Sequence, residues 1–211
     1  MTIKVNESKK LFALETSKTS YVFGLDPFGL LRHLYWGTKV ESIEDFEMPE
    51  LVEVSTNDPV FEITPEEYPV YGSLRYKEHC LKVTFADRTR EVVYAYEGYT
   101  KNENELIIHL KDTHYALAIN LHYVVHPSVD LIERFVSVKN ESDDMMEIEQ
   151  IQSAQFHIPY QDLNFTNTHG HWGAELQRFT QKVNYGKIRI ENRRGISTHN
   201  HNPFFILDKD A

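Results

Sequence analysis

The chain has 211 residues, of which 41% are hydrophobic and 26% are charged, and a globular chain of this length can bury a substantial core. Its formal net charge of -10 argues against nucleic acid and against an anionic membrane surface as partners, because both attract clustered Lys and Arg. It has no run of about 18 apolar residues and no apolar segment near its start, so we expect neither a transmembrane helix nor a signal peptide.

Period-two alternation dominates the pattern of apolar residues and predicts an all-β protein. Residues 11–14 and 21–25 predict an opening hairpin. Further strands are predicted, in chain order, at residues 79–85, 91–96, 105–110, 115–125, 131–139 and 145–157. The strands from residue 115 onward are long and closely spaced, which favours a meander within a large antiparallel sandwich.

One stretch, residues 43–61, does not alternate. It is acidic, contains no Lys or Arg and is interrupted by Pro49 and Pro59, so we interpret it as a long loop with at most a short helical turn. A long loop in a compact domain is either a solvated surface segment or a functional loop, and the sequence leaves both interpretations open.

The only cysteine, Cys80, excludes an intramolecular disulfide and is typical of a reducing compartment, so we expect a cytoplasmic protein. A lone cysteine acts as a nucleophile only where its thiol is activated, for example by a neighbouring base. The sequence assigns no such base to Cys80, so we expect a buried structural thiol.

Residues 169–175, with the sequence HGHWGAE, form a candidate metal motif. On an extended strand His169 and His171 point to one face, where both rings could bind a metal with Glu175 as a third ligand. The spacing is that of the cupin metal site, although the glycines expected on either side are absent. His171 and Glu175 could also serve as the acid and base of an aldose epimerase. We predict no metal at this motif. We interpret it instead as a hydrogen-bonded loop with Trp172 packed on the sandwich.

Residues 192–204, with the sequence NRRGISTHNHNPF, are dense in polar, shape-specific side chains. Gly195 permits a positive φ, Pro203 fixes the entry into a last strand, and Arg193 and Arg194 could act as bidentate donors. The segment is therefore a ligand wall, a docking surface for another domain, or a hydrogen-bonded loop. The chain stops soon after this strand, so we expect a truncated part of a longer protein.

Residues 66–72, with the sequence EEYPVYG, combine carboxylates with aromatic rings. Many sugar sites do the same, because rings stack on the apolar face of a sugar and carboxylates accept hydrogen bonds from its hydroxyl groups. Tyr35, Trp36 and Trp172 invite the same interpretation, although aromatic residues in a β protein more often belong to the core. A glycosidase needs two carboxylates that flank one bond, and no such pair stands out. A stand-alone carbohydrate-binding module therefore stays open beside the epimerase and the cupin-like metal protein.

Four motifs, in this order along the chain, resemble those of glycoside hydrolase family 36. They are residues 35–37 (YWG), 67–72 (EYPVYG), 171–175 (HWGAE) and 193–204 (RRGISTHNHNPF). The last resembles the family pattern Arg-Arg-Gly-x-Ser-Ser-His-x-x-Asn-Pro-Phe, with Thr198 in place of the second Ser, and it is the most specific of the four. The resemblance extends from about Tyr21 to Leu207 and so includes most of the chain.

The resemblance implies a fold and an activity. Members of the family are mostly α-galactosidases, with some α-N-acetylgalactosaminidases. Their amino-terminal domain is a large antiparallel β-supersandwich similar to that of galactose mutarotases, and here it would occupy residues 1–211. A catalytic (β/α)8 barrel and a small carboxy-terminal β domain would follow. Hydrolysis of terminal α-galactosides such as melibiose and raffinose is retaining and uses two barrel Asp residues. Both catalytic residues would then lie outside this chain, and neither a metal nor an organic cofactor is required.

The resemblance also implies contacts made by this domain. In the family it supports the barrel, and many bacterial members are tetramers in which amino-terminal loops reach a neighbour's active site. The matching region here is the acidic loop that leads to Tyr68. Family members use an Asp and an Arg in that loop, and this sequence has no Arg there. The residues expected to contact substrate or a neighbouring domain are Tyr68, Trp172, Arg194, His199 and Asn202.

Overall fold

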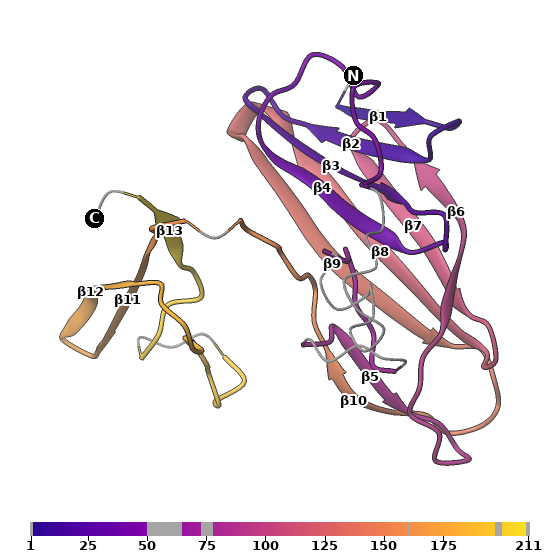
Figure 1. Ribbon diagram of the computed structural model, residues 1–211. Helices are drawn as coiled ribbons and strands as arrows, with labels where there is room; N and C mark the ends of the chain where they lie inside the picture. The colour runs from indigo at the N-terminus through magenta and orange to yellow at the C-terminus, as the bar shows by residue number, and fades with distance from the viewer. Residues whose placement is uncertain (1, 50–64, 73–77, 160, 197–199, 210–211) are drawn as a thin grey trace. The chain divides into compact units, whose positions relative to one another are not determined.

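The computed structural model describes residues 2–49, 65–72, 78–159, 161–196 and 200–209, and Figure 1 traces the chain. The chain forms two compact units, Met1–His157 and Ile158–Ala211, which are described separately. Nearly all regular structure is antiparallel β-strand, which confirms the predicted all-β fold class. Within the described residues, no helix is long and apolar enough to cross a membrane.

The first unit begins with a four-stranded antiparallel sheet in the order β1-β2-β3-β4. The pairing of β2 with β3 confirms the hairpin predicted near the start of the chain. Its strands are β1 (Ile3–Asn6), β2 (Leu11–Glu15), β3 (Thr19–Leu25) and β4 (Leu31–Thr38).

Both faces of β2 are buried, which explains why its sequence is apolar without alternation. Phe12 and Leu14 belong to the main core, whereas Leu11 and Ala13 belong to a second cluster on the opposite face. Ile43 completes that second cluster, and Phe46 and Met48 pack against it. The part of the predicted loop that is described, residues 43–49, therefore covers the outer face of the sheet, and the rest of that loop lies outside the described residues.

A second four-stranded antiparallel sheet has the order β6-β7-β8-β9, so the meander includes the predicted strands at 115–125 and 131–139 but begins earlier than predicted, and the predicted strand at 145–157 pairs with β5 (Leu81–Thr84) instead. In β7 and β8, buried residues alternate with partly exposed ones, because one face of the sheet packs on the core. A short 3-10 turn, η1 (Pro127–Val129), leads into Asp130, which adopts the left-handed conformation with φ 54° and ψ 46°. The four strands are β6 (Tyr94–Lys101), β7 (Glu105–Asp112), β8 (Leu117–His126) and β9 (Leu131–Asn140).

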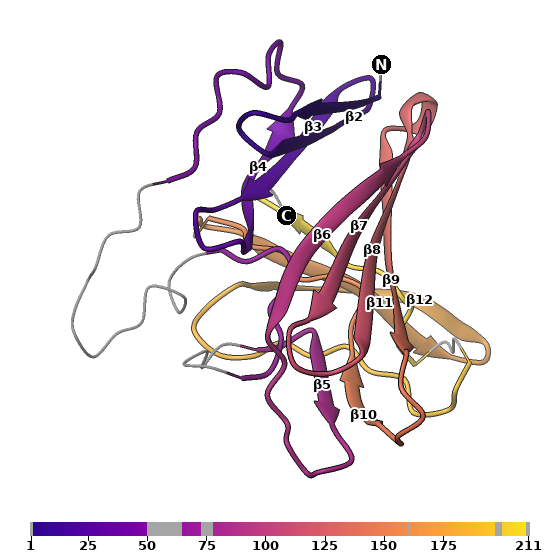
Figure 2. The ribbon, with the colours of Figure 1, turned by 90° about the vertical axis from the view of Figure 1, so that its right-hand side faces the viewer.

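Stacked aromatic rings join the sheet β1-β2-β3-β4 to the sheet β6-β7-β8-β9. Figure 2 shows these two sheets as the layers of the first unit. Phe23 of β3 stacks on Phe12 of β2 with ring centroids 5.2 Å apart, and on Tyr123 of β8 at 5.0 Å. All three side chains are almost completely buried. A smaller pair, β5 (Leu81–Thr84) and β10 (Glu147–Ile151), adds apolar residues from β5 to the same core.

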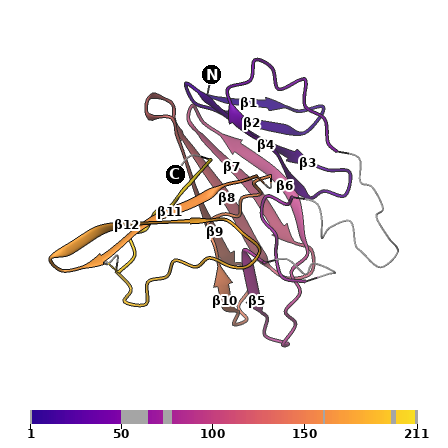
Figure 3. The same cartoon turned by 60° about the vertical axis from the view of Figure 1, so that its left-hand side comes forward.

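The second unit is a three-stranded antiparallel sheet in the order β12-β11-β13. Its strands are β11 (Asn164–His171), β12 (Ala174–Lys182) and β13 (Ile206–Asp208), and Figure 3 shows the hairpin formed by the first two. Among the described residues of this unit, the buried side chains are polar: Asn164, Thr166 and Asn167. Large apolar side chains are exposed instead, including Phe179, Phe204, Phe205 and Ile206.

Two predicted strands have different bounds in the structure. The strand predicted at residues 91–96 begins only at Tyr94 and continues to Lys101 through a bulge at Glu97, where the alternation of side chains shifts. The strand predicted at residues 145–157 is confined to Glu147–Ile151, because the chain beyond it leaves its partner β5.

Cys80 is fully buried and not in a disulfide, which confirms the predicted structural thiol. Burial raises its pKa to about 12, because the thiolate would lose its hydration. Thiol reagents attack the thiolate. We therefore expect iodoacetamide to leave Cys80 unmodified in the folded protein and to alkylate it fully in denaturant, as measured by intact-protein mass spectrometry. Equal alkylation rates in both conditions would contradict the buried position.

Candidate functional site

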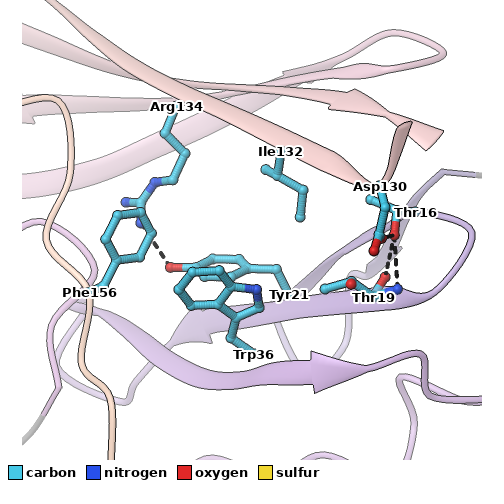
Figure 4. Close-up of a pocket in the computed structure, with 8 residues that line it drawn as sticks. All are labelled: Thr16, Thr19, Tyr21, Trp36, Asp130, Ile132, Arg134 and Phe156. Atoms are coloured by element: carbon cyan, nitrogen blue, oxygen red, sulfur yellow. Dashed lines mark hydrogen bonds between the residues drawn. The ribbon is translucent and has the colours of Figure 1, made fainter. Parts of the chain in front are cut away.

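The first unit contains a pocket of about 220 Å³ between its two sheets. Figure 4 shows that its lining comes from the β2–β3 turn, from β3 and β4, from the start of β9, and from the segment after β10. The pocket is small compared with sites for drug-sized ligands, which begin at about 300 Å³. The lining residues are Thr16, Thr19, Tyr21, Trp36, Asp130, Ile132, Arg134 and Phe156.

Aromatic rings form one wall of this pocket. The rings of Trp36 and Phe156 lie 5.2 Å apart and are 51% and 45% exposed, so both present apolar surface to solvent. Tyr21 lies behind Trp36, edge to face with their ring centroids 6.1 Å apart, and is buried. Trp36 is therefore supported on one side and open on another.

The opposite end of the pocket is polar. The Thr16 hydroxyl donates to the Asp130 carboxylate, and the Thr19 backbone N–H donates to the Thr16 hydroxyl oxygen at 2.9 Å. Hydrogen bonds from Thr16 and Thr19 lower the pKa of Asp130, so its carboxylate is charged at neutral pH. Figure 4 shows this group facing Arg134 and Phe156 across Ile132.

Arg134 belongs to a buried ionic network beneath the pocket. Its Nη2 lies 2.8 Å from Glu67 Oε1, and the two side chains are only 6% and 0% exposed. The hydroxyls of Tyr21 and Tyr123 also donate to Glu67. Burial, together with the nearby Glu67 carboxylate, raises the pKa of both tyrosines, so their hydroxyls remain protonated donors. The Arg134 guanidinium also lies 4.9 Å from the centroid of the Phe156 ring.

Tyr68, one of the predicted contact residues, is fully buried. Its hydroxyl donates to the backbone carbonyl of Gln152 at 3.2 Å, and the neighbouring Glu66 and Glu67 are also fully buried. In this packing the motif at residues 66–72 stabilises the interior of the first unit. A contact between Tyr68 and substrate would require that packing to open, and it stays a prediction.

Trp172 lies in the turn between β11 and β12 and is 87% exposed, rather than packed as the loop alternative expected. The register between β11 and β12 shifts from the pair His169–Gln177 to the pair His171–Ala174, with the extra residue on β12. His171 Nδ1 lies 2.9 Å from the Trp172 carbonyl, and Glu175 accepts a hydrogen bond from the Gly173 N–H. Both side chains thus interact within the turn itself. Across the described residues, no group of three or more His, Cys, Asp or Glu side chains is placed to hold a metal ion.

Asn202 ties its segment to β11. Its side-chain oxygen accepts from the Thr168 hydroxyl at 2.9 Å, and its carbonyl accepts from the Asn167 amide at 3.2 Å. The Arg194 side chain is exposed, while Gly195 has the predicted positive φ, 71°. His199 lies outside the described residues.

The pocket and the predicted contact residues do not coincide. Tyr68, the predicted contact residue in the first unit, does not line the pocket, and Trp172, Arg194 and Asn202 belong to the second unit. Arg134 and Asp130 were not predicted as site residues. One sequence signal could have found Arg134: it occupies a position between Ile132 and Val136 on the face of a strand that is otherwise apolar. A buried arginine requires a buried partner, and that partner, Glu67, is far away in sequence.

Residues 29–211 match the glycosyl hydrolase family 36 N-terminal domain. The match covers most of the chain and agrees with the antiparallel sandwich seen in the structure. The chain belongs to this family.

Relatives support the assignment. The chain is 30% identical over 215 residues to Probable alpha-galactosidase G of Emericella nidulans, covering 93% of the chain and 30% of that protein. The crystal structure of the GH36 alpha-galactosidase AgaB from Geobacillus stearothermophilus matches with a TM-score of 0.86 at 25% identity, covering 98% of the chain and 32% of that structure.

A variant of the alpha-galactosidase AgaA from Geobacillus stearothermophilus, solved in complex with raffinose, shares the fold with a TM-score of 0.81 at 24% identity, covering 94% of the chain and 31% of that structure. The chain thus spans only about 30% of the length of the relatives that it matches.

Proposed function

We propose that the chain is the non-catalytic amino-terminal domain of an α-galactosidase. The whole protein would hydrolyse terminal non-reducing α-D-galactosyl residues, as in melibiose and raffinose, with retention of configuration. The family match over residues 29–211 carries the proposal, together with the share of each α-galactosidase that the chain spans. Residues 1–211 would form one functional domain, followed by a catalytic barrel and a carboxy-terminal β domain.

The chemistry of the pocket supports a non-catalytic role. A retaining glycosidase needs two carboxyl groups about 5–5.5 Å apart. Among the eight lining residues of the pocket, Asp130 is the one carboxylate. Glu66 and Glu67 are fully buried, and Glu67 is paired with Arg134. The catalytic pair is therefore expected in the barrel of the whole protein.

The surface of the second unit supports a role in docking. Its exposed apolar side chains are of the kind that a further domain or a second copy covers in a larger assembly. We assign the contacts with substrate or a neighbouring domain to Tyr68, Trp172, Arg194, His199 and Asn202. The whole protein would be a homo-oligomer, a tetramer, as the family resemblance implies, and the buried Cys80 fits a reducing cytoplasm.

An activity assay tests this proposal. The 211-residue chain and the complete protein are compared on p-nitrophenyl α-galactoside and on raffinose, with p-nitrophenyl β-galactoside as the control substrate. We expect turnover of the two α-galactosides by the complete protein only. Robust turnover by the 211-residue chain would overturn the non-catalytic role. A complete protein that is inactive on both α-galactosides would overturn the substrate assignment.

A further inference from the structure

We infer that the pocket between Trp36, Asp130 and Arg134 is a binding site for one neutral sugar ring. The inference concerns the first unit alone and does not depend on the activity of the complete protein. Four features of the pocket carry it: an open aromatic wall, a charged acceptor at the far end, an internally neutralised cation, and a fixed geometry.

The aromatic wall suits the apolar face of a pyranose. The Trp36 ring is 51% exposed and Phe156, beside it, is 45% exposed. Exposure of these half-buried rings to water is unfavourable. The C–H face of a sugar can cover the rings while the hydroxyl groups of the sugar stay at the edge of the aromatic wall. Ile132 adds an apolar surface on the β9 side of the pocket.

The polar end suits the hydroxyl groups of a sugar. Asp130 presents a carboxylate whose charged form is stabilised by Thr16 and Thr19, and a carboxylate only accepts hydrogen bonds. Hydroxyl groups of a ligand can donate to its second oxygen. Because the interaction involves a charged acceptor, each such hydrogen bond contributes more than a neutral one.

The charges of the pocket favour a neutral ligand. Arg134 is the cation nearest to the wall, but Glu67 neutralises it at 2.8 Å from beneath. Its Nη1 is also engaged with the Tyr21 hydroxyl at 2.9 Å. Among the eight lining residues the remaining charge is that of Asp130, which repels anions, and the nearby Lys18 stabilises that carboxylate. A phosphate or a carboxylate is therefore disfavoured, and a polyol is favoured.

The lining residues are held in place without a ligand, and this preorganisation lowers the entropic cost of binding. Asp130 sits in a left-handed turn tied to Thr16, and Arg134 is fixed by its buried ion pair. Trp36 is held between Tyr21 and Phe156. A cavity of about 220 Å³ has room for one ring rather than for an extended oligosaccharide.

The test is a calorimetric titration of the 211-residue chain with methyl α-D-galactoside, repeated with methyl α-D-glucoside. We expect saturable binding with a dissociation constant in the millimolar range, as for a site that contacts a single small ring. Trp36→Ala, which removes the wall, and Asp130→Asn, which keeps the shape and removes the charge, should each weaken binding by roughly tenfold or more. Phe28→Ala, which removes an exposed aromatic ring of the first unit outside the pocket lining, should bind as the parent does.

Three outcomes would overturn the inference. The first is the absence of saturable binding of either glycoside up to about 100 mM, well above the expected range. The second is unchanged affinity in folded Trp36→Ala and Asp130→Asn variants, which places any binding elsewhere. The third is tighter binding of galacturonate than of the neutral glycosides, which contradicts the charge argument. Circular dichroism and thermal unfolding of each variant separate loss of the site from loss of the fold.

Discussion

Replacing Arg134 by alanine is expected to destabilise the first unit by about 3–5 kcal/mol, the usual cost of breaking a buried ion pair from one side. Glu67 is 0% exposed and would keep two tyrosine hydroxyl donors but lose its cation. The lost cation also lies over the Phe156 ring, so the wall of the pocket should loosen as well. Urea unfolding followed by circular dichroism measures the change.

Two controls separate the charge effect from the loss of packing. Combining Glu67→Gln with Arg134→Met removes both charges and keeps the side-chain volume, so most of the lost stability should return. Arg90→Ala removes another arginine paired with a glutamate, Glu149, but that pair is 40% and 26% exposed. Its loss should cost no more than about 1 kcal/mol. If Arg134→Ala and the double variant were equally unstable, the uncompensated charge of Glu67 would not be the cause.

The strands that the sequence predicted are those in which polarity and burial coincide. In β8, buried Leu117, Ile119 and Leu121 alternate with partly exposed residues, so period-two alternation finds the strand and its neighbours. The turn residues between these strands then indicate the meander, because short connections make antiparallel neighbours. This half of the fold follows from local signals.

In the strands that were not predicted, polarity and burial do not coincide. β4 carries Arg32, which is almost fully buried because Asp26 pairs with it at 2.7 Å. β11 buries the polar residues Asn164, Thr166 and Asn167, so burial in this strand is not marked by apolar alternation. Among the described strands the short β1 pairs only with β2, and its apolar residues are too few to stand out. In each case tertiary contacts override the local pattern.

The pocket could not be predicted for a related reason. Its lining comes from segments between Thr16 and Phe156, and the position of each segment depends on the sandwich having formed. Asp130 becomes part of the pocket only because the η1 turn places it in a left-handed conformation next to Thr16. The sequence identifies Trp36 as an aromatic residue, but its exposure is a property of the folded edge of the sheet. The predicted motifs, by contrast, are recognised as family patterns rather than by their geometry.

Replacing Phe23 by alanine should cost about 3–5 kcal/mol, because it removes the ring that links the two sheets and leaves a cavity. Phe23 is 0% exposed and stacks on Phe12 and Tyr123 at 5.2 and 5.0 Å. Urea unfolding monitored by circular dichroism gives the value.

Two control variants separate the effect of burial from the effect of side-chain volume at Phe23. Phe28→Ala removes the same side chain where it is 66% exposed and should change stability by less than about 0.5 kcal/mol. Phe23→Leu keeps most of the apolar volume and should cost less than about 1.5 kcal/mol. If Phe23→Ala were as stable as Phe28→Ala, the stack would not hold the sheets together. If Phe23→Leu were as unstable as Phe23→Ala, the geometry of the aromatic stack, rather than the filled volume, would determine the stability of the sandwich.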